Sequence, residues 1–301
     1  MCRPTLRPSD AELLTKHSDT MELYCVMGNP VEHSRSPWIH ARFAELTGQS
    51  MAYHRRLAPL DGFAEAIAAW RDEAAANGDL ACGCNVTVPF KLDAATLAQH
   101  KTARAELAQA VNVLSFSADG VQGDNSDGIG LVNDIRLNAG VALTGRDVLL
   151  LGAGGAAAGV LGPLLGAGAR RVVVANRTLH KAVALVQRHA TLALQCHASL
   201  EAQELGTVTG TFDVIVNATA SSLAGAAVPV AARVLKPGAL AFDMMYGPAA
   251  AGFLQWAQAH DAVPRDGLGM LVEQAAEAFT IWRGVRPPAA QVLGELRAAL
   301  G

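Results

Sequence analysis

Residues 85–91 (NVTVPFK) and 125–128 (NSDG) carry side chains suited to binding a polar substrate and to moving a proton. Polar and apolar positions alternate in the first stretch, so Asn85 and Thr87 share one face of a strand and Lys91 follows one turn beyond. The second stretch supplies the carboxylate of Asp127. A lysine and an aspartate at the mouth of a cleft form either a surface ion pair, which adds little stability, or a proton-transfer pair. The residues alone leave both interpretations open.

Residues 28–37 (GNPVEHSRSP) place two hydroxyl groups, those of Ser34 and Ser36, beside the start of a helix. Hydroxyls and the free backbone N–H groups of a first helical turn are suited to binding a carboxylate. A serine at this place is also a common helix cap, and the stretch taken alone favours capping. Pro37, just inside the helix, agrees with either role.

Residues 152–157 (GAGGAA) fit the pattern G-x-G-x-x-G/A of dinucleotide-binding turns. They follow a continuous apolar strand over 147–151 and open a helix, which is the context that the pattern requires. Gly152 permits the tight turn, Gly154 lets the backbone approach a pyrophosphate, and the helix N-terminus supplies free N–H groups and a partial positive charge. The context favours a dinucleotide site over a packing turn.

The turn after the next predicted strand, 171–175, distinguishes the two nicotinamide cofactors. An NAD site places an acid there for the ribose 2′-OH, whereas this turn reads Asn176-Arg177-Thr178, with Lys181 close behind and no carboxylate. Arg177 is suited to stacking on adenine and, with Thr178 and Lys181, to holding a 2′-phosphate. The alternative is an ordinary solvated helix start. We predict NADP.

Hydrophobic patterning divides the chain into two halves of different texture. Strands are predicted over 23–27, 83–88, 110–116, 121–124, 147–151, 171–175, 212–216 and 239–243, with a short one near 263. Helices are predicted over 37–46, 63–76, 180–189, 252–260 and 270–284. A further helix follows the glycine turn and ends at about 168, and an alanine-rich helix begins at 288. From about residue 130 strands and helices alternate regularly, which indicates a doubly wound parallel sheet.

Composition and charge exclude several classes of protein. Among the 301 residues 51% are hydrophobic and 17% charged, so the chain is a folded globular protein. With a formal net charge of −3 and no dense Lys/Arg run, we expect neither a nucleic-acid nor a membrane partner. Residues 148–169 lack charge, but their glycines and Pro163 favour a strand, a turn and a buried helix over a membrane span.

Cysteine and histidine usage points to a reducing cytoplasm and to no metal. The five cysteines have no disulfide-framework spacing, and Cys82 and Cys84 are too close for a zinc knuckle. His33, His40 and His54 lack ligand spacing. The first twenty residues contain acidic side chains and no apolar core, which argues against a signal or transit peptide.

Together the motifs resemble one enzyme family, the shikimate dehydrogenases. The runs GNPVEHSRSP, NVTVPFK, AVN, DNSDG, GAGGAA, NRT, NAT, DMMYGP and GLGMLVEQAAEAF occur in the family's order over residues 23–284. The resemblance implies an α/β fold with an N-terminal substrate-binding domain, a doubly wound Rossmann domain for NADP, and the active site in the cleft between them. We expect an extension over 1–20, a substrate domain over 21–128 with 268–301 packing back on it, and the NADP domain over 129–267.

The resemblance also implies a role for each motif residue. Ser34 and Ser36 resemble the ligands of the substrate carboxylate, and Tyr246 the tyrosine near it. Lys91 resembles the catalytic lysine, with Asp127 beside it. The implied partners of the ring hydroxyls are Asn85, Thr87, Asn112, Asp127 and Gln274. The implied cofactor ligands are Gly152, Ala153, Gly154, Gly155, Ala156, Asn176, Arg177, Thr178 and Lys181, with Gly267 against the nicotinamide.

Three positions depart from the family pattern. Gln109 replaces a glycine, a residue that adopts backbone dihedral angles rare for other residues. Val113 replaces a threonine beside Asn112. Ser126 replaces a threonine but keeps a hydroxyl group. We expect these changes to affect substrate affinity rather than the class of reaction.

The implied reaction is the reversible NADPH-dependent reduction of 3-dehydroshikimate to shikimate in chorismate biosynthesis, with Lys91 and Asp127 assisting proton transfer. The alternatives are a quinate/shikimate dehydrogenase that uses NAD, an enzyme for aminoshikimate or a related compound, and a non-catalytic binding protein with the same pocket. Retention of Lys91, Asp127 and the glycine turn disfavours the last. The expected partners are a small-molecule substrate and, at most, a second copy in a homodimer.

Overall fold

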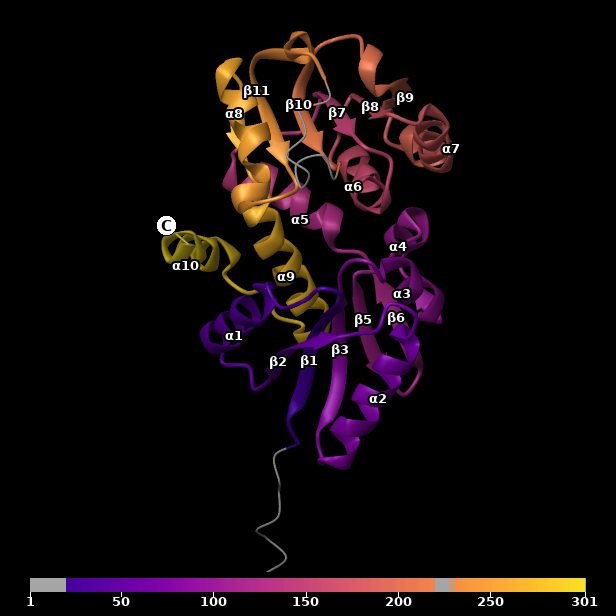
Figure 1. The fold of residues 1–301 in the computed structure, drawn as a ribbon, viewed down its shortest axis with the longest axis vertical. Coiled ribbons are helices and arrows are strands. Elements are labelled where there is room, and N and C mark those ends of the chain that lie inside the picture. The colour runs from indigo at the N-terminus through magenta and orange to yellow at the C-terminus, as the bar shows by residue number, and fades with distance from the viewer. Residues whose placement is uncertain (1–19, 220–227, 229, 301) are drawn as a thin grey trace, which may run out of the picture.

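The chain folds into two six-stranded sheets, which lie one below the other in Figure 1. The computed structural model describes residues 20–219, 228 and 230–300, so the extension expected over 1–20 lies outside the described residues except for its last position. Both sheets are covered by helices, and each encloses its own hydrophobic cores.

The lower sheet, in the N-terminal half, has the strand order β2-β1-β3-β5-β6-β4. β5 runs antiparallel to both of its neighbours, and the remaining pairs are parallel. Its strands are β1 (Glu22–Gly28), β2 (Ala52–Leu57), β3 (Leu80–Val86), β4 (His100–Lys101), β5 (Val113–Ser117) and β6 (Gly120–Asp124). Its helices are α1 (Ser36–Thr47), α2 (Phe63–Ala76), α3 (Lys91–Leu97) and α4 (Ala103–Ala108).

The upper sheet is entirely parallel, with the order β12-β11-β10-β7-β8-β9. This is the strand order of a doubly wound dinucleotide-binding sheet. Successive strands are added from β7 outward to β9 at one edge, and then from β10 outward to β12 at the other edge. Its strands are β7 (Asp147–Leu151), β8 (Arg171–Asn176), β9 (Ser199–Glu204), β10 (Phe212–Asn217), β11 (Leu235–Asp243) and β12 (Val263–Arg265). Its helices are α6 (Gly155–Gly166), α7 (Leu179–Gln195) and α8 (Ala251–Ala259). The predicted sheet is confirmed, and every residue of β7 is buried.

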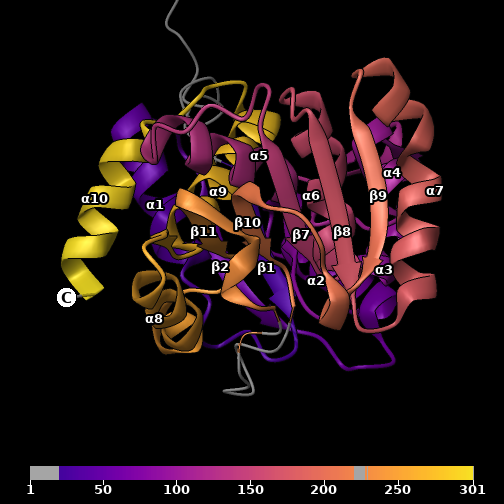
Figure 2. The ribbon, with the colours of Figure 1, turned by 90° about the horizontal axis from the view of Figure 1, so that it is seen from above.

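Two helical segments connect the halves. α5 (Asp127–Asn133) leads upward and continues as a π-helix over Asp134–Asn138, while α9 (Leu268–Arg283) leads back and is followed by α10 (Ala289–Leu300). Ile39 and Phe43 of α1 share a core with Val272 and Phe279 of α9 and with Val292 of α10. Figure 2 shows α10 beside α1, on the side of the molecule opposite α7. The C-terminal end of the chain therefore packs on the N-terminal half.

Most predicted elements match the structure within a few residues, and the differences have physical causes. The strand predicted over 83–88 ends at Val86, and the helix predicted over 180–189 runs on to Gln195. The edge strands β2 and β9 were not predicted, because their solvent-facing polar residues hide the apolar alternation. None of the described helices is long and apolar enough to cross a bilayer.

Candidate active site

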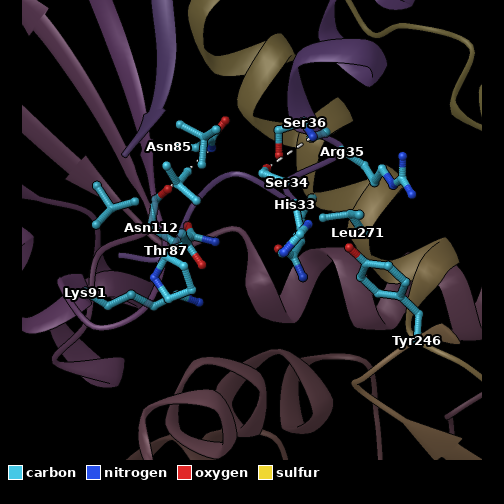
Figure 3. A pocket seen from close by; sticks show the side chains of 16 residues that line it. His33, Ser34, Arg35, Ser36, Asn85, Thr87, Lys91, Asn112, Tyr246 and Leu271 are labelled. Carbon is cyan, nitrogen blue, oxygen red and sulfur yellow. Dashed lines mark hydrogen bonds between the residues drawn. The ribbon is translucent and has the colours of Figure 1, made fainter. Parts of the chain in front are cut away.

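A cavity of about 310 Å³ opens between the two halves, at the carboxyl ends of β1 and β3 (Figure 3). The two loops that follow these strands are joined, because Asn29 donates a backbone hydrogen bond to the carbonyl of Val88 over 3.0 Å. The cavity lining includes Ser34, Ser36, Asn85, Thr87, Lys91, Asn112, Tyr246 and Gln274. The structure thus brings these proposed ligands together from segments far apart in the sequence.

The Ser34–Ser36 loop forms one end of the cavity. α1 begins at Ser36, and Arg35 occupies the cap position without a side-chain cap. Ser34 Oγ accepts a hydrogen bond from the backbone N–H of Ser36 over 3.3 Å, while Arg55 of β2 donates two hydrogen bonds to the carbonyl of Ser34, at 3.0 and 2.6 Å. The capping role considered for Ser36 is therefore wrong. Its hydroxyl lines the cavity.

Positive charge at this end of the cavity comes from Arg35, a residue that the motifs did not single out. Arg35 lines the cavity and acts on Tyr246: burial raises the pKa of the tyrosine, and the nearby guanidinium lowers it in part. Figure 3 shows the Arg35 and Tyr246 side chains on the same side of the cavity, opposite Lys91. A cation beside two hydroxyl groups suits an anionic substituent. Its position in the sequence between Ser34 and Ser36 could have identified Arg35 as a candidate substrate ligand.

Lys91 and Asp127 form an ion pair at the edge of the first cavity. Lys91 Nζ lies 2.6 Å from Asp127 Oδ2, and the lysine side chain is 24% exposed whereas the aspartate is 3% exposed. Lys91 begins α3 in the lower half, and Asp127 begins α5. The pair is therefore held by two helix starts, with its cation at the cavity and its carboxylate buried. This geometry disfavours the surface ion pair that the sequence left open.

Hydrogen bonds hold the Asp127 carboxylate from the other side. Asn112 Nδ2 donates to Asp127 Oδ1 over 2.8 Å and to Ser126 Oγ over 3.1 Å. Asn112 Oδ1 accepts from the backbone N–H of Ser126 over 2.8 Å. Asn125 Oδ1 accepts from the backbone N–H of Asp127 over 3.0 Å. The turn before α5 is fixed by its own side chains, so the carboxylate has one orientation.

A second cavity, of about 260 Å³, lies over the glycine turn between β7 and α6. Its lining includes Ala153, Gly154 and Gly155 of the turn, Lys181 and Arg188 of α7, and Leu92 and Gln109 of the lower half. Gly152 has φ +105°, and a side chain there would press on the carbonyl of Ala218. A Cβ at Gly154 or Gly155 would meet no atom within 4 Å, so the backbone is open to a ligand.

These features fit the pyrophosphate of a dinucleotide. The first intrahelical hydrogen bond of α6 is accepted by Gly154, which leaves the N–H groups of the first turn, including that of Ala156, for an anion. The end of β8 carries Asn176, whose side chain donates to the carbonyl of Thr178 over 2.9 Å, and the exposed Arg177. This strand end holds no carboxylate.

Gly267 caps α9 and lies outside the linings of both cavities. Its N–H donates to the carbonyl of Met245 over 2.8 Å, and a side chain at Gly267 would overlap the carbonyl of Met244. The close approach explains why glycine stands here. Contact of Gly267 with a nicotinamide stays a prediction.

Gln109 and Val113, two of the departures from the family pattern, have different surroundings. Gln109 ends α4 with φ +53°, the left-handed conformation in which glycine is favoured, and it lines the second cavity. Val113 is fully buried and paired in register with Asn85 of β3 and Asp124 of β6. Gln109 therefore bears on the cofactor side of the cleft, and Val113 is a packing residue behind the substrate ligands.

Within the described part of the chain, no three His, Cys, Asp or Glu side chains are arranged to hold a metal ion. Cys25 and Cys84 lie side by side in register on β1 and β3, both buried. Burial raises the pKa of Cys25, which keeps this thiol protonated.

Comparison with known proteins agrees with this architecture. Residues 26–114 match the model of the shikimate dehydrogenase substrate binding domain, residues 136–238 that of shikimate / quinate 5-dehydrogenase, and residues 267–297 that of the shikimate 5'-dehydrogenase C-terminal domain. The shikimate dehydrogenase (NADP(+)) of Paracidovorax citrulli (strain AAC00-1) is 68% identical over 280 residues, which are 93% of this chain and 98% of the relative.

Solved structures share the fold of this chain. The Ael1 enzyme from Pseudomonas putida is 42% identical, with a TM-score of 0.82 over 91% of this chain and 98% of that one. Shikimate 5-dehydrogenase from Thermus thermophilus, in complex with NADP(H) and shikimate, is 30% identical, with a TM-score of 0.78 over 93% of this chain and 100% of that one. On its sequence, its fold and the residues gathered in its cleft, this chain belongs to the shikimate dehydrogenase family.

Proposed function

We propose that the chain catalyses the reversible NADPH-dependent reduction of 3-dehydroshikimate to shikimate, a step of chorismate and aromatic amino acid biosynthesis. One observation carries the proposal beyond family membership. Lys91 lines the first cavity and its chain neighbour Leu92 lines the second, so the Lys91–Asp127 pair stands where the polar cavity meets the glycine turn. A reaction between a cofactor and a polar small molecule needs a proton donor at that junction.

The second cavity, together with the end of β8 and the turn after it, has the residues to hold NADP; Asn176, Arg177 and Thr178 belong to that strand end and turn and lie outside the lining of the cavity. The first turn of α6 would bind the pyrophosphate, and Asn176, Arg177, Thr178 and Lys181 would surround the adenosine phosphate. The nicotinamide supplies the hydride when the cofactor is bound. The absence of an acid at the end of β8 supports NADP over NAD.

The first cavity has the residues to hold a hydroxylated ring acid. Ser34 and Ser36 would bind the carboxylate, with Arg35 and Tyr246 close to it. Asn85, Thr87, Asn112, Asp127 and Gln274 would bind the ring hydroxyls, and all of them except the buried Asp127 line the cavity. This distribution orients the ring, with its carboxylate at the serine end and its reacting carbon near Lys91.

Lys91 would stabilise the charge that develops on the carbonyl oxygen. In the reduction, that oxygen gains electron density, and an ammonium group directed at it donates a hydrogen bond or a proton. Asp127 keeps Lys91 in place through the 2.6 Å contact and would accept a hydrogen bond from a substrate hydroxyl. Closure of the cleft would exclude water and strengthen both interactions.

The test is an oxidation assay with shikimate and separate additions of NADP and NAD, repeated with quinate. Rapid formation of reduced nicotinamide with shikimate and NADP alone is the expected result. Comparable rates with NAD or quinate would instead support a dual-specificity dehydrogenase. A folded protein that binds NADP yet turns over neither substrate would contradict the proposal.

We further propose that the enzyme works in the cytoplasm as a monomer or homodimer. The proposed substrate ligands that line the interdomain cleft all belong to one chain, which is compatible with an active monomer. Light scattering of the purified protein measures the molar mass, with 31.3 kDa or twice that value expected.

A further inference from the structure

Tyr53 reaches across the lower sheet to a proposed substrate ligand. Its hydroxyl lies 2.6 Å from Asn85 Oδ1, although Tyr53 belongs to β2 and Asn85 to β3, with β1 between them. Tyr53 is not among the residues that line the cavity, whereas Asn85 is. The tyrosine therefore contacts the binding residue from behind.

The hydrogen bonds of Asn85 determine which end of its amide faces which partner. Asn85 Nδ2 donates to the backbone carbonyl of Asn112 over 3.3 Å. A carbonyl oxygen only accepts, so this contact fixes the nitrogen on that side and the oxygen toward Tyr53. Asn85 Oδ1 likewise only accepts, so the phenol is the donor. The amide has a second N–H, and Asn85 lines the cavity beside the buried ring of His40.

Tyr53 is itself held in place by a buried histidine of α1. The rings of Tyr53 and His40 are stacked, with centroids 4.2 Å apart and planes 5° from parallel. His40 is fully buried, and burial lowers its pKa to about 3, so the ring is neutral. Burial also raises the pKa of Tyr53 well above its usual value, so the phenol keeps the proton that it donates.

We propose that Tyr53 is a positioning residue for the reaction: it fixes the Asn85 amide so that a free N–H, and not the carbonyl, points at a ring hydroxyl of the substrate. Asn85 then donates to the oxygen of that hydroxyl, and the hydroxyl keeps its own proton for another acceptor in the cavity. The substrate is thereby selected for a hydroxyl at one ring position. This role rests on the proposed shikimate dehydrogenase function.

The decisive variant is Tyr53→Phe, which removes one oxygen and keeps the ring stacked on His40. Without the phenol donor Asn85 loses the hydrogen bond at Oδ1, and we expect kcat/KM for shikimate to fall about tenfold, the equivalent of one hydrogen bond. Tyr24→Phe is the matched control. Tyr24 is the register partner of Tyr53 on β1, is also buried, and its hydroxyl pairs with Glu22 and Arg283 instead of a cavity residue.

Substrate analogues separate positioning from general damage. Shikimate lacking either of its two non-reacting ring hydroxyls is assayed with the wild type and with Tyr53→Phe. For the analogue that lacks the hydroxyl bound by Asn85, the tenfold effect of the variant should shrink to less than about twofold, since no hydrogen bond remains to be oriented. In an Asn85→Ala background, Tyr53→Phe should add no further loss.

The outcomes distinguish the two proposals. A wild type that oxidises shikimate while Tyr53→Phe keeps full kcat/KM would overturn the role of Tyr53 alone. An equal loss for shikimate and for both analogues would do the same, since it would indicate a purely structural role. A wild type inactive with shikimate would overturn the proposed function together with the role that depends on it. Melting temperatures confirm that each variant is folded.

Discussion

Asn112 donates a hydrogen bond from Nδ2 to Asp127 Oδ1 over 2.8 Å, which leaves Oδ2 of the same carboxylate for Lys91 at 2.6 Å. The two oxygens thus have separate partners, and the carboxylate cannot rotate without breaking one of the contacts. The charge-assisted contact is the stronger of the two. The direction of the Lys91 ammonium group is therefore set by an amide just before β5, through a carboxylate at the start of α5.

Replacement of Lys91 by alanine should remove the donor at the reacting oxygen. We expect kcat to fall by about 10²–10³-fold, with a smaller change in the KM for shikimate, because the interaction strengthens as charge develops. Steady-state kinetics with NADP measures both parameters. Lys101→Ala is the control, since Lys101 contacts backbone carbonyls at the end of α3 and lines neither of the two cavities described above. An unchanged kcat would exclude Lys91 from the chemistry.

Replacement of Ser36 by alanine should weaken binding of the substrate carboxylate. Since this contact is equally strong in the ground state and the transition state, the KM for shikimate should rise about tenfold while kcat changes little. Kinetics at saturating NADP measures the split. Ser50→Ala, an exposed serine beyond the end of α1, should leave both values unchanged. A fall in kcat alone would contradict the assignment.

Replacement of both Arg177 and Lys181 by alanine should reduce discrimination between the cofactors. Each cation interacts with the 2′-phosphate, which NAD lacks, so the ratio of kcat/KM for NADP to that for NAD should fall by at least about tenfold. Rates with NAD serve as the internal control and should stay within about twofold of the wild type. An unaltered ratio would place the 2′-phosphate elsewhere.

Replacement of Gln109 by glycine should stabilise the protein, because Gln109 has φ +53° at the end of α4. Relief of the left-handed strain exceeds the added entropy of the unfolded chain, and we expect a gain of about 0.5 kcal/mol, or a rise in Tm of about 1–2 °C. Glu106→Gly, inside the same helix, should lower Tm instead. Equal losses for the two variants would show that Gln109 is unstrained.

Acidification should destabilise the fold through His40. Its pKa is 6.5 in an unfolded chain and about 3 when buried, so the unfolded chain takes up a proton in this range and the folded chain does not. The stability that the neutral ring contributes is complete above about pH 6.5 and is lost by about 1.4 kcal/mol per unit as the pH falls toward 3. Tm measured from pH 7.5 to 4.5 gives the slope.

The variant His40→Phe keeps a stacked ring and should flatten this pH dependence. Some slope should remain, because burial also lowers the pKa of His189. His54→Phe, on the exposed face of β2, should retain the full slope. A wild-type slope in His40→Phe would show that His40 does not titrate on unfolding.

Much of the fold could be predicted from local patterns. The buried strand β7 and the glycine turn after it have a signature that is complete within about twenty residues, because hydrophobic run, turn and helix start adjoin one another. The left-handed position of Gln109 was likewise visible, since the resemblance placed it where glycine is usual.

The contacts that cross the sheets could not be predicted. Tyr53 lies in the edge strand β2, where one histidine and two arginines follow it. Nothing in that run of residues predicts a strand or a partner on β3. Arg55 holds the Ser34 loop by donating to the backbone carbonyl of Ser34. Every residue has such a carbonyl, so the type of the accepting residue does not predict this contact. Such pairs depend on strand order, which periodicity does not encode.

The return of α9 and α10 onto α1 bears on the order in which the protein is made. During synthesis, α1 leaves the ribosome long before these helices exist, so the core around Ile39 and Phe43 stays incomplete until α9 and α10 have been made. The nucleotide half, in contrast, has all its strands once Arg265 has been added. Domains usually fold in the order of their synthesis. Here the half that holds the substrate cavity is begun first and completed last, and a chain stopped before Leu268 would carry a finished nucleotide sheet beside an open hydrophobic face.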